Sequence, residues 1–139
     1  LFCRILRSAD DRKNFVLWRT RHSYVLLNIY PYNNGHLMVA PRRHKRTLEL
    51  LSKEEVCDLM EQVQRAKRLL DKVLEPQGYN IGINIGRAAG AGYEQHLHVH
   101  IVPRWSGDIN FMPLIGQTKT MPQLLEDTRT LISTGWIDV

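Results

Sequence analysis

The sequence predicts an α+β fold in which an antiparallel sheet packs against one long helix, with a second helix near the C-terminus. Two observations predict the sheet: short β-prone segments recur along the chain, and one of them alternates apolar and polar residues strictly. A third observation predicts the long helix, because apolar residues recur at helical spacing between Ser52 and Pro76. The elements follow in the order strands, helix, strands, helix, which fits an antiparallel sheet covered by a helix.

Length and composition are typical of one globular domain, which we expect to span residues 1–139. No apolar run approaches the roughly 20 residues needed to cross a membrane, which argues against an integral membrane protein. Cys3 and Cys57 lie far apart and do not suggest a disulfide framework, and no signal peptide is visible. We therefore expect a cytoplasmic location. The net charge of +5 fits a polyanionic ligand, either a nucleotide or a nucleic acid.

The N-terminal part of the chain predicts a short strand followed by a hairpin-like pair of strands. Residues 15–18 form the predicted first strand, after a polar turn or loop. Residues 24–30 and 36–41 are β-prone and flank a turn-forming segment of proline, tyrosine, asparagines and glycine. Asn28 interrupts an otherwise apolar run, and on the pattern alone it is a polar residue at the edge of the sheet.

The long helix begins with a predicted capping box, in which Ser52 is the N-cap and Glu55 follows three residues later. Proline and glycine at positions 76 and 78 end it. We expect its leucines and Met60 to lie in the core. Another strand is predicted over residues 79–85, and the C-terminal helix is predicted to begin at Thr120 and to end at Gly135.

The most informative segment is residues 96–105, where His96, His98 and His100 alternate with branched apolar residues. Positions two apart on a strand point to the same side, so the three imidazoles share one face of the sheet. Each imidazole has two ring nitrogens that need partners, which favours a site over core packing. Three interpretations stay open here: a solvated strand face, a three-histidine metal site, and covalent catalysis with His98 as nucleophile.

Two neighbouring segments suit a ligand that carries phosphate. The glycine-rich residues 86–92 lead directly into the histidine row, and such loops let backbone N–H groups approach phosphate oxygens closely. Residues 42–46 form a basic cluster, which is either a solvated surface or a source of charge-assisted contacts with a polyphosphate. Aromatic residues are not interleaved with this cluster, so we do not expect a nucleic-acid partner.

The segment HLHVHIV resembles the histidine-triad signature, and the resemblance extends through almost the whole chain. Asn28, His36, the Pro-Arg-Arg-His segment, Asn84 and the glycine-rich loop fall in the expected order. The runs 103–111 and 122–129 resemble one branch in particular, the bacterial diadenosine-tetraphosphate phosphorylases of histidine-triad type. The resemblance implies an α+β histidine-triad fold, a homodimer and an adenine nucleotide substrate. Family members often carry serine or glutamine in the loop where this chain has Ala91 and Gly92, which leaves phosphate to backbone amides.

The resemblance also implies a catalytic role for four histidines. His98 attacks the α-phosphorus of a nucleotide ester, and phosphate or water then releases the nucleotidyl-histidine intermediate. His96 serves as general acid at the leaving oxygen, His100 stabilises charge on non-bridging oxygens, and His36 holds the hydrogen-bond chain of the triad. The expected substrate-binding residues are Asn28, Asn84, Gly90, Ala91, Gly92, Gln95, Trp105, Leu26 and Met38.

The resemblance also implies a metal site and an acceptor for the nucleotidyl group. In relatives with a CxxC pair, a structural zinc is held at the positions that correspond to Cys3, His44 and His96, and the other cysteine of the pair would precede Leu1. The alternative is that Cys3 is only a small buried residue. The covalent step is expected to need no cofactor, with Mg²⁺ kept open as a companion of the substrate. Phosphorolysis of diadenosine tetraphosphate to ADP and ATP is favoured. The alternatives are hydrolysis with release of AMP, cleavage of nucleoside phosphoramidates, and a non-catalytic nucleotide- or metal-binding module.

Overall fold

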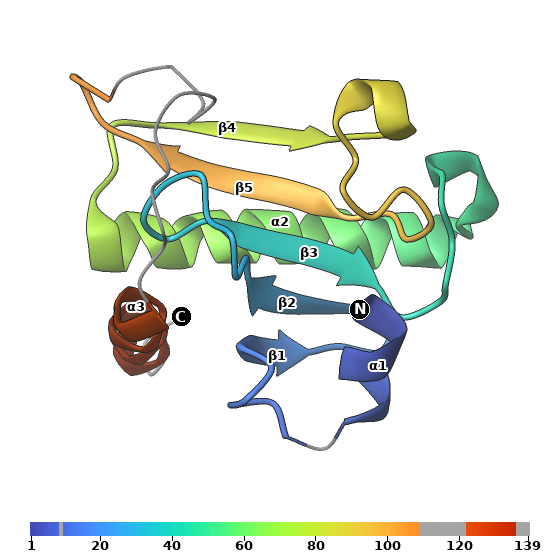
Figure 1. Ribbon diagram of the computed structural model, residues 1–139, viewed down its shortest axis with the longest axis horizontal. Helices are drawn as coiled ribbons and strands as arrows, with labels where there is room; N and C mark the ends of the chain where they lie inside the picture. The colour runs from blue at the N-terminus through green and yellow to red at the C-terminus, as the bar shows by residue number, and fades with distance from the viewer. Residues whose placement is uncertain (9, 109–121, 136–139) are drawn as a thin grey trace.

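The computed structural model describes residues 1–8, 10–108 and 122–135 and confirms the α+β fold (Figure 1). Five strands, two longer helices and a short N-terminal helix make up most of this part of the chain. In chain order the elements are α1 (Phe2–Arg7), β1 (Val16–Arg19), β2 (Ser23–Leu27), β3 (Leu37–Pro41), the 3₁₀ turn η1 (Leu48–Leu50), α2 (Lys53–Leu74), β4 (Gly78–Ile83), the 3₁₀ turn η2 (Arg87–Ala89), β5 (Val99–Arg104) and α3 (Pro122–Thr134).

The strands form one antiparallel sheet in the order β1-β2-β3-β5-β4. The predicted pair of strands over residues 23–41 is confirmed, because β2 and β3 are neighbours. The register places Met38 and Gly82 directly opposite His100, on either side of it. Directly opposed residues on neighbouring strands share a face, so Met38 and His100 lie side by side on one face of the sheet.

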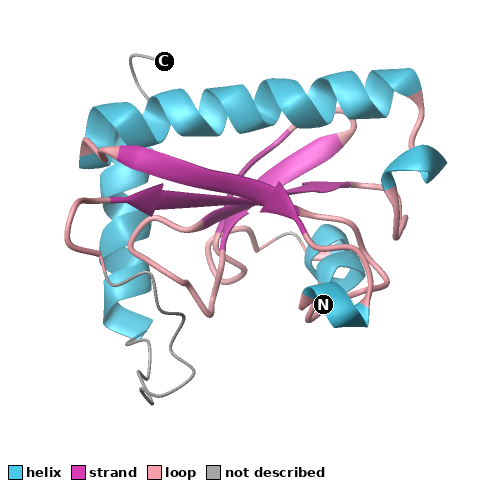
Figure 2. Ribbon diagram, turned by 90° about the horizontal axis from the view of Figure 1, so that it is seen from above, coloured by secondary structure: helices cyan, strands magenta, loops and turns pink. Residues whose placement is uncertain are grey.

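Helix α2 covers the face of the sheet opposite to α1 (Figure 2). Its capping box is present: the Ser52 hydroxyl accepts from the Glu55 N–H at 3.3 Å, and the Glu55 carboxylate accepts from the Ser52 N–H at 2.7 Å. Leucine, valine and alanine side chains of α2 form one core with the alternate residues of β2, β3 and β5 that face it. Met60 is 46% exposed, so its predicted core position is wrong. No helix in the described ranges is long and apolar enough to cross a bilayer.

The other face of the sheet is only partly covered. Helix α1 lies over it, and Phe2 and Ile5 join Tyr24, Leu26 and Met38 in a second, smaller core. The sequence did not predict α1, because it has six residues and lacks a side-chain cap. His100 lies on the same face, because it is directly opposite Met38 in the register, and this places the candidate site beside α1.

Two predicted boundaries differ from the structure. The histidine segment pairs as a strand only from Val99, while the preceding Leu97 N–H donates to the Lys45 carbonyl at 2.6 Å. Thr120, the predicted cap of the C-terminal helix, lies outside the described residues, and α3 is described from Pro122.

Candidate active site

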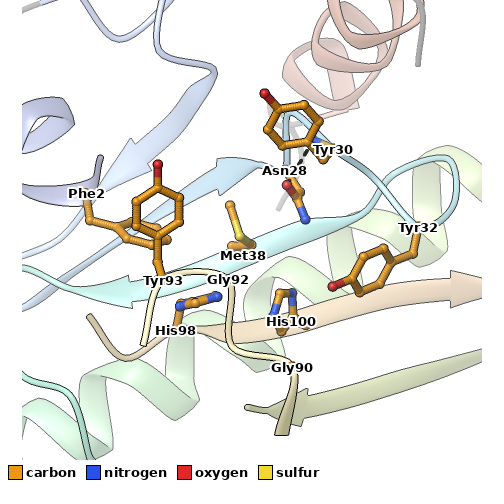
Figure 3. Close-up of a pocket in the computed structure, with 10 residues that line it drawn as sticks. All are labelled: Phe2, Asn28, Tyr30, Tyr32, Met38, Gly90, Gly92, Tyr93, His98 and His100. Atoms are coloured by element: carbon orange, nitrogen blue, oxygen red, sulfur yellow. Dashed lines mark hydrogen bonds between the residues drawn. The ribbon is translucent and has the colours of Figure 1, made fainter. Parts of the chain in front are cut away.

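A pocket of about 330 Å³ opens on the α1 side of the sheet, beside His98 and His100 (Figure 3). Its walls come from α1, from the segment after β2, from β3, from the glycine-rich loop and from β5, so distant parts of the sequence meet here. The lining residues are Phe2, Asn28, Tyr30, Tyr32, Met38, Gly90, Gly92, Tyr93, His98 and His100.

The tautomer of His98 follows from one hydrogen bond. Its Nδ1 lies 2.8 Å from the backbone oxygen of His96. A carbonyl oxygen only accepts, so Nδ1 carries the proton and Nε2 has a free lone pair. Burial lowers the pKa of His98 below its usual value, although the hydrogen bond to the His96 carbonyl acts in the opposite direction. The ring is therefore neutral at pH 7, as a nitrogen nucleophile must be.

A second chain of hydrogen bonds determines the tautomer of His100. The Tyr32 backbone N–H donates to His36 Nδ1 at 3.0 Å, so His36 carries its proton on Nε2. That nitrogen lies 2.9 Å from His100 Nδ1, which must accept. His100 therefore keeps its own proton on Nε2. Burial, then the neighbouring histidines, lowers the pKa of His36 to about 3, and burial followed by His98 lowers that of His100 to about 4.

The two rings consequently present opposite groups at the pocket. His98 offers a bare nitrogen, and His100 offers an N–H donor. His36 does not line the pocket but lies behind His100, packed at 5.1 Å between ring centroids. This arrangement can attack an electrophilic phosphorus and at the same time donate a hydrogen bond to one of its oxygens.

His96 has both ring nitrogens directed at protein groups and does not line the pocket. Its Nε2 donates to the Pro41 carbonyl at 2.9 Å, and its Nδ1 lies 3.2 Å from His44 Nδ1. The expected role of His96 as a general acid is therefore not supported by this geometry, since no nitrogen is free to reach a leaving group. His96 supports the site through its backbone, because its carbonyl orients His98.

Cys3, His44 and His96 come together, as the metal prediction requires. Cys3 Sγ lies 3.1 Å from His44 Nδ1 and 3.9 Å from His96 Nδ1. Ligands held tetrahedrally by zinc at about 2.0 to 2.3 Å lie roughly 3.3 to 3.6 Å apart, so these spacings are close to those of a zinc site. The bond from His96 Nε2–H to Pro41 leaves Nδ1 unprotonated, which is the form that binds a metal. The three side chains therefore fit zinc.

The predicted substrate-binding residues divide into two groups. Asn28, Met38, Gly90 and Gly92 line the pocket. The others do not line it. Leu26 and Ala91 are buried, and the Asn84 side chain lies close to Gly90. Gln95 lines a separate groove, and Trp105 directly follows the C-terminal end of β5.

The sequence analysis missed the aromatic walls of the pocket. Tyr30 is 74% and Tyr32 54% exposed, on the turn between β2 and β3. Tyr93, directly after the glycine-rich loop, is exposed, and the ring centroids of Phe2 and His98 lie 5.0 Å apart. Such faces suit a planar base. The tyrosines on either side of Pro31 were a signal for this, because large aromatic residues are unusual at an exposed turn.

Comparison with known proteins gives consistent results. A family model described as HIT domain matches residues 10–107. A Mycobacterium tuberculosis protein named AP-4-A phosphorylase is 48% identical over 127 residues, which are 91% of this chain. The chain spans only 65% of that relative's length. The Schizosaccharomyces pombe bis(5'-nucleosyl)-tetraphosphatase [asymmetrical] is 35% identical over 100 residues, which are 72% of this chain and 54% of that protein.

A solved structure supports the fold assignment. It is described as a Zn-bound histidine triad family protein from Mycobacterium smegmatis, and it is 28% identical to this chain. The two agree with a TM-score of 0.78, over 96% of this chain and 90% of that one.

Proposed function

The chain belongs to the HIT domain family, which confirms the histidine-triad resemblance, and from this premise we propose that it splits diadenosine tetraphosphate by phosphorolysis, releasing ADP and ATP. One observation carries the proposal: a neutral histidine, His98, holds a bare Nε2 at a pocket of nucleotide size. The similarity to the Mycobacterium tuberculosis AP-4-A phosphorylase favours this substrate and inorganic phosphate as acceptor.

In the first step, the lone pair of His98 Nε2 attacks the α-phosphorus. An N–P bond forms, and the bond from phosphorus to the bridging oxygen breaks, so the leaving nucleotide takes the electron pair. The positive charge that develops on the imidazole is held by the bond from Nδ1–H to the His96 carbonyl. His100 Nε2–H donates a hydrogen bond to a phosphate oxygen. A polyphosphate leaving group is weakly basic and needs no proton from His96.

In the second step, an oxygen of inorganic phosphate attacks the same phosphorus. The N–P bond breaks, its electron pair returns to His98, and ADP leaves. Water in place of phosphate gives AMP, which is the hydrolase alternative favoured by the similarity to the Schizosaccharomyces pombe tetraphosphatase. The two reactions differ only in the acceptor.

The nucleotide is proposed to lie between the aromatic walls and the glycine-rich loop. Tyr93 supplies an exposed aromatic face for the base, the buried Phe2 packs against Tyr93, and Asn28 supplies polar groups for the ribose. Gly90 has a φ of +81°, which only glycine adopts without strain, and this turn exposes the loop backbone to a phosphate.

We propose that Cys3, His44 and His96 hold a structural zinc ion. The ligand spacings and the Zn-bound Mycobacterium smegmatis relative support this. When bound, the metal would tie α1 to the segments after β3 and before β5, and it takes no part in phosphoryl transfer. Magnesium as a companion of the substrate stays a prediction.

A homodimer is also a proposal. Strand β4 is the last strand in the order of the sheet, and its Ile81 is exposed, as is Met60 of α2. An edge strand with apolar neighbours suits pairing with a second copy. The single domain over 1–139 and the cytoplasmic location stay predictions.

Analysis of the reaction products distinguishes a phosphorylase, a hydrolase and a non-catalytic binding module. The protein is incubated with diadenosine tetraphosphate, with and without inorganic phosphate, and the nucleotides are resolved. ADP that forms only with phosphate supports the phosphorylase. AMP that forms regardless of phosphate identifies a hydrolase, and binding without any product identifies a non-catalytic module.

A further inference from the structure

A second hollow lies beside the loop that precedes the histidine row. It consists of two pockets, of about 290 and 250 Å³, that both include Arg46 and Gln95. One wall is the basic segment after β3, and the other consists of residues at the start of the glycine-rich loop and directly after it. We call it the Arg46 groove; its main lining residues are Lys45, Arg46, Thr47, Ile85, Glu94 and Gln95.

The charges in the Arg46 groove are unbalanced toward positive. Arg46 is exposed and forms no ion pair within the described ranges, although the exposed Glu49 carboxylate is near it. Glu94, the acid that lines the groove, is already paired with Arg87 at 3.3 Å. Lys45 adds a second cation. The groove therefore attracts an anion with several charges.

The Arg46 groove also offers apolar surface. Ile85 and Leu50 line it, and each is 44% exposed. The Gln95 side chain is exposed between the two pockets and can both donate and accept hydrogen bonds. Cations beside apolar faces and an amide suit a ligand that joins phosphates to a planar base.

The Arg46 groove and the catalytic pocket share one loop as a wall. Gly90, Gly92 and Tyr93 line the catalytic pocket, and the next two residues line the groove. A volume of about 330 Å³ is at the small end for ligand sites, so the catalytic pocket holds about one nucleotide. The remainder of a dinucleoside polyphosphate must lie outside it. With its α-phosphorus at His98, that remainder needs a neighbouring surface, and the groove begins at the residues that directly follow Tyr93.

We propose that the Arg46 groove binds the leaving nucleotide, which is the part of a dinucleoside polyphosphate beyond the attacked phosphorus. Arg46 and Lys45 contact its phosphate oxygens, and Ile85 contacts its base. This inference rests on the proposed function and extends it. Binding energy from this remote part of the substrate then favours dinucleoside polyphosphates over esters of a single nucleotide.

The test measures binding without turnover. In a chain carrying His98→Asn, calorimetry compares diadenosine tetraphosphate with AMP, before and after Arg46→Gln. We expect Arg46→Gln to weaken diadenosine tetraphosphate about tenfold and to change AMP by less than twofold, because AMP does not reach the groove. Arg68→Gln is the matched control: it removes the same charge from the exposed side of α2, and it should change neither affinity. Lys45→Gln should reproduce the Arg46→Gln pattern more weakly.

Four results would overturn the inference. An equal loss for both ligands, or no loss for either, removes the Arg46 groove from substrate binding while the proposed function stands. Unchanged affinity for diadenosine tetraphosphate, with a higher phosphate concentration needed for ADP formation by the Arg46→Gln enzyme, assigns the groove to the acceptor phosphate instead. If the His98→Asn chain binds neither nucleotide, the inference and the proposed function are both wrong.

Discussion

The stability of this fold should depend on pH through His36. This side chain is 1% exposed, and its Nδ1 accepts a backbone hydrogen bond while its Nε2–H donates to His100. Burial, with smaller contributions from His100 and His98, lowers its pKa from 6.5 to about 3. The unfolded chain therefore binds a proton at His36 at pH values where the folded chain does not. The neutral ring of His36 therefore makes its full contribution to the free energy of unfolding above pH 6.5, and this contribution is lost as the pH falls toward 3.

The size of this effect follows from the two pKa values. Between pH 7 and pH 6, protonation of the unfolded chain at His36 removes about 0.7 kcal/mol of unfolding free energy; between pH 7 and pH 5, it removes about 2 kcal/mol. The folded chain takes up almost no proton there, so nothing offsets the loss. His100, with a pKa of about 4, changes stability in the same direction.

Urea unfolding of wild type and His36→Gln at pH 7, 6 and 5 measures this contribution. Glutamine retains a side-chain donor toward His100 and does not titrate. The other groups titrate in both proteins, so the difference between them isolates His36. The wild type should lose about 2 kcal/mol more than the variant on going to pH 5. Parallel pH profiles would refute the assignment of His36 as a buried neutral ring.

Three further predictions concern turnover, packing and metal. His98→Asn should lower turnover by more than about a thousandfold while nucleotide affinity stays within a few-fold, and product chromatography with calorimetry checks both; a variant with full activity would exclude the covalent mechanism. Gly35→Ala should cost about 2 to 4 kcal/mol in chemical unfolding, because Gly35 has a φ of +73° and a new Cβ would collide with Leu74; an unchanged midpoint would contradict this packing. Cys3→Ser should remove zinc and lower the melting temperature by several degrees, whereas the exposed Cys57→Ser should do neither; equal zinc in both variants, measured by metal analysis, would exclude the site.

Much of the fold could be predicted because its signals are local. The capping box at Ser52 and Glu55 and the apolar spacing after it are properties of one segment, and they predicted α2. The alternation around His98 predicted which side chains share a face. Met60 was assigned wrongly because helical spacing gives the direction of a side chain on the helix and not the extent of the sheet it meets.

The site was predicted less completely, because its details depend on contacts between distant residues. The histidine row indicated a reactive centre, but the tautomer of His100 depends on His36, 64 residues earlier. His96 lies in the same row and was given a role at the substrate. Its ring instead meets Pro41 and His44, which no local pattern could show. Phe2 reaches the pocket only because α1 folds over the sheet.

Detection of the covalent intermediate tests the central claim most directly. The protein is mixed with diadenosine tetraphosphate in the absence of inorganic phosphate and denatured at alkaline pH, which preserves a phosphorus–nitrogen bond. Intact mass spectrometry should show the addition of one adenylyl group, and peptide mapping should place it on His98. The adduct should disappear when phosphate is added, with ADP in its place. An enzyme that forms ADP without any such adduct, or that carries it on another residue, would contradict the account.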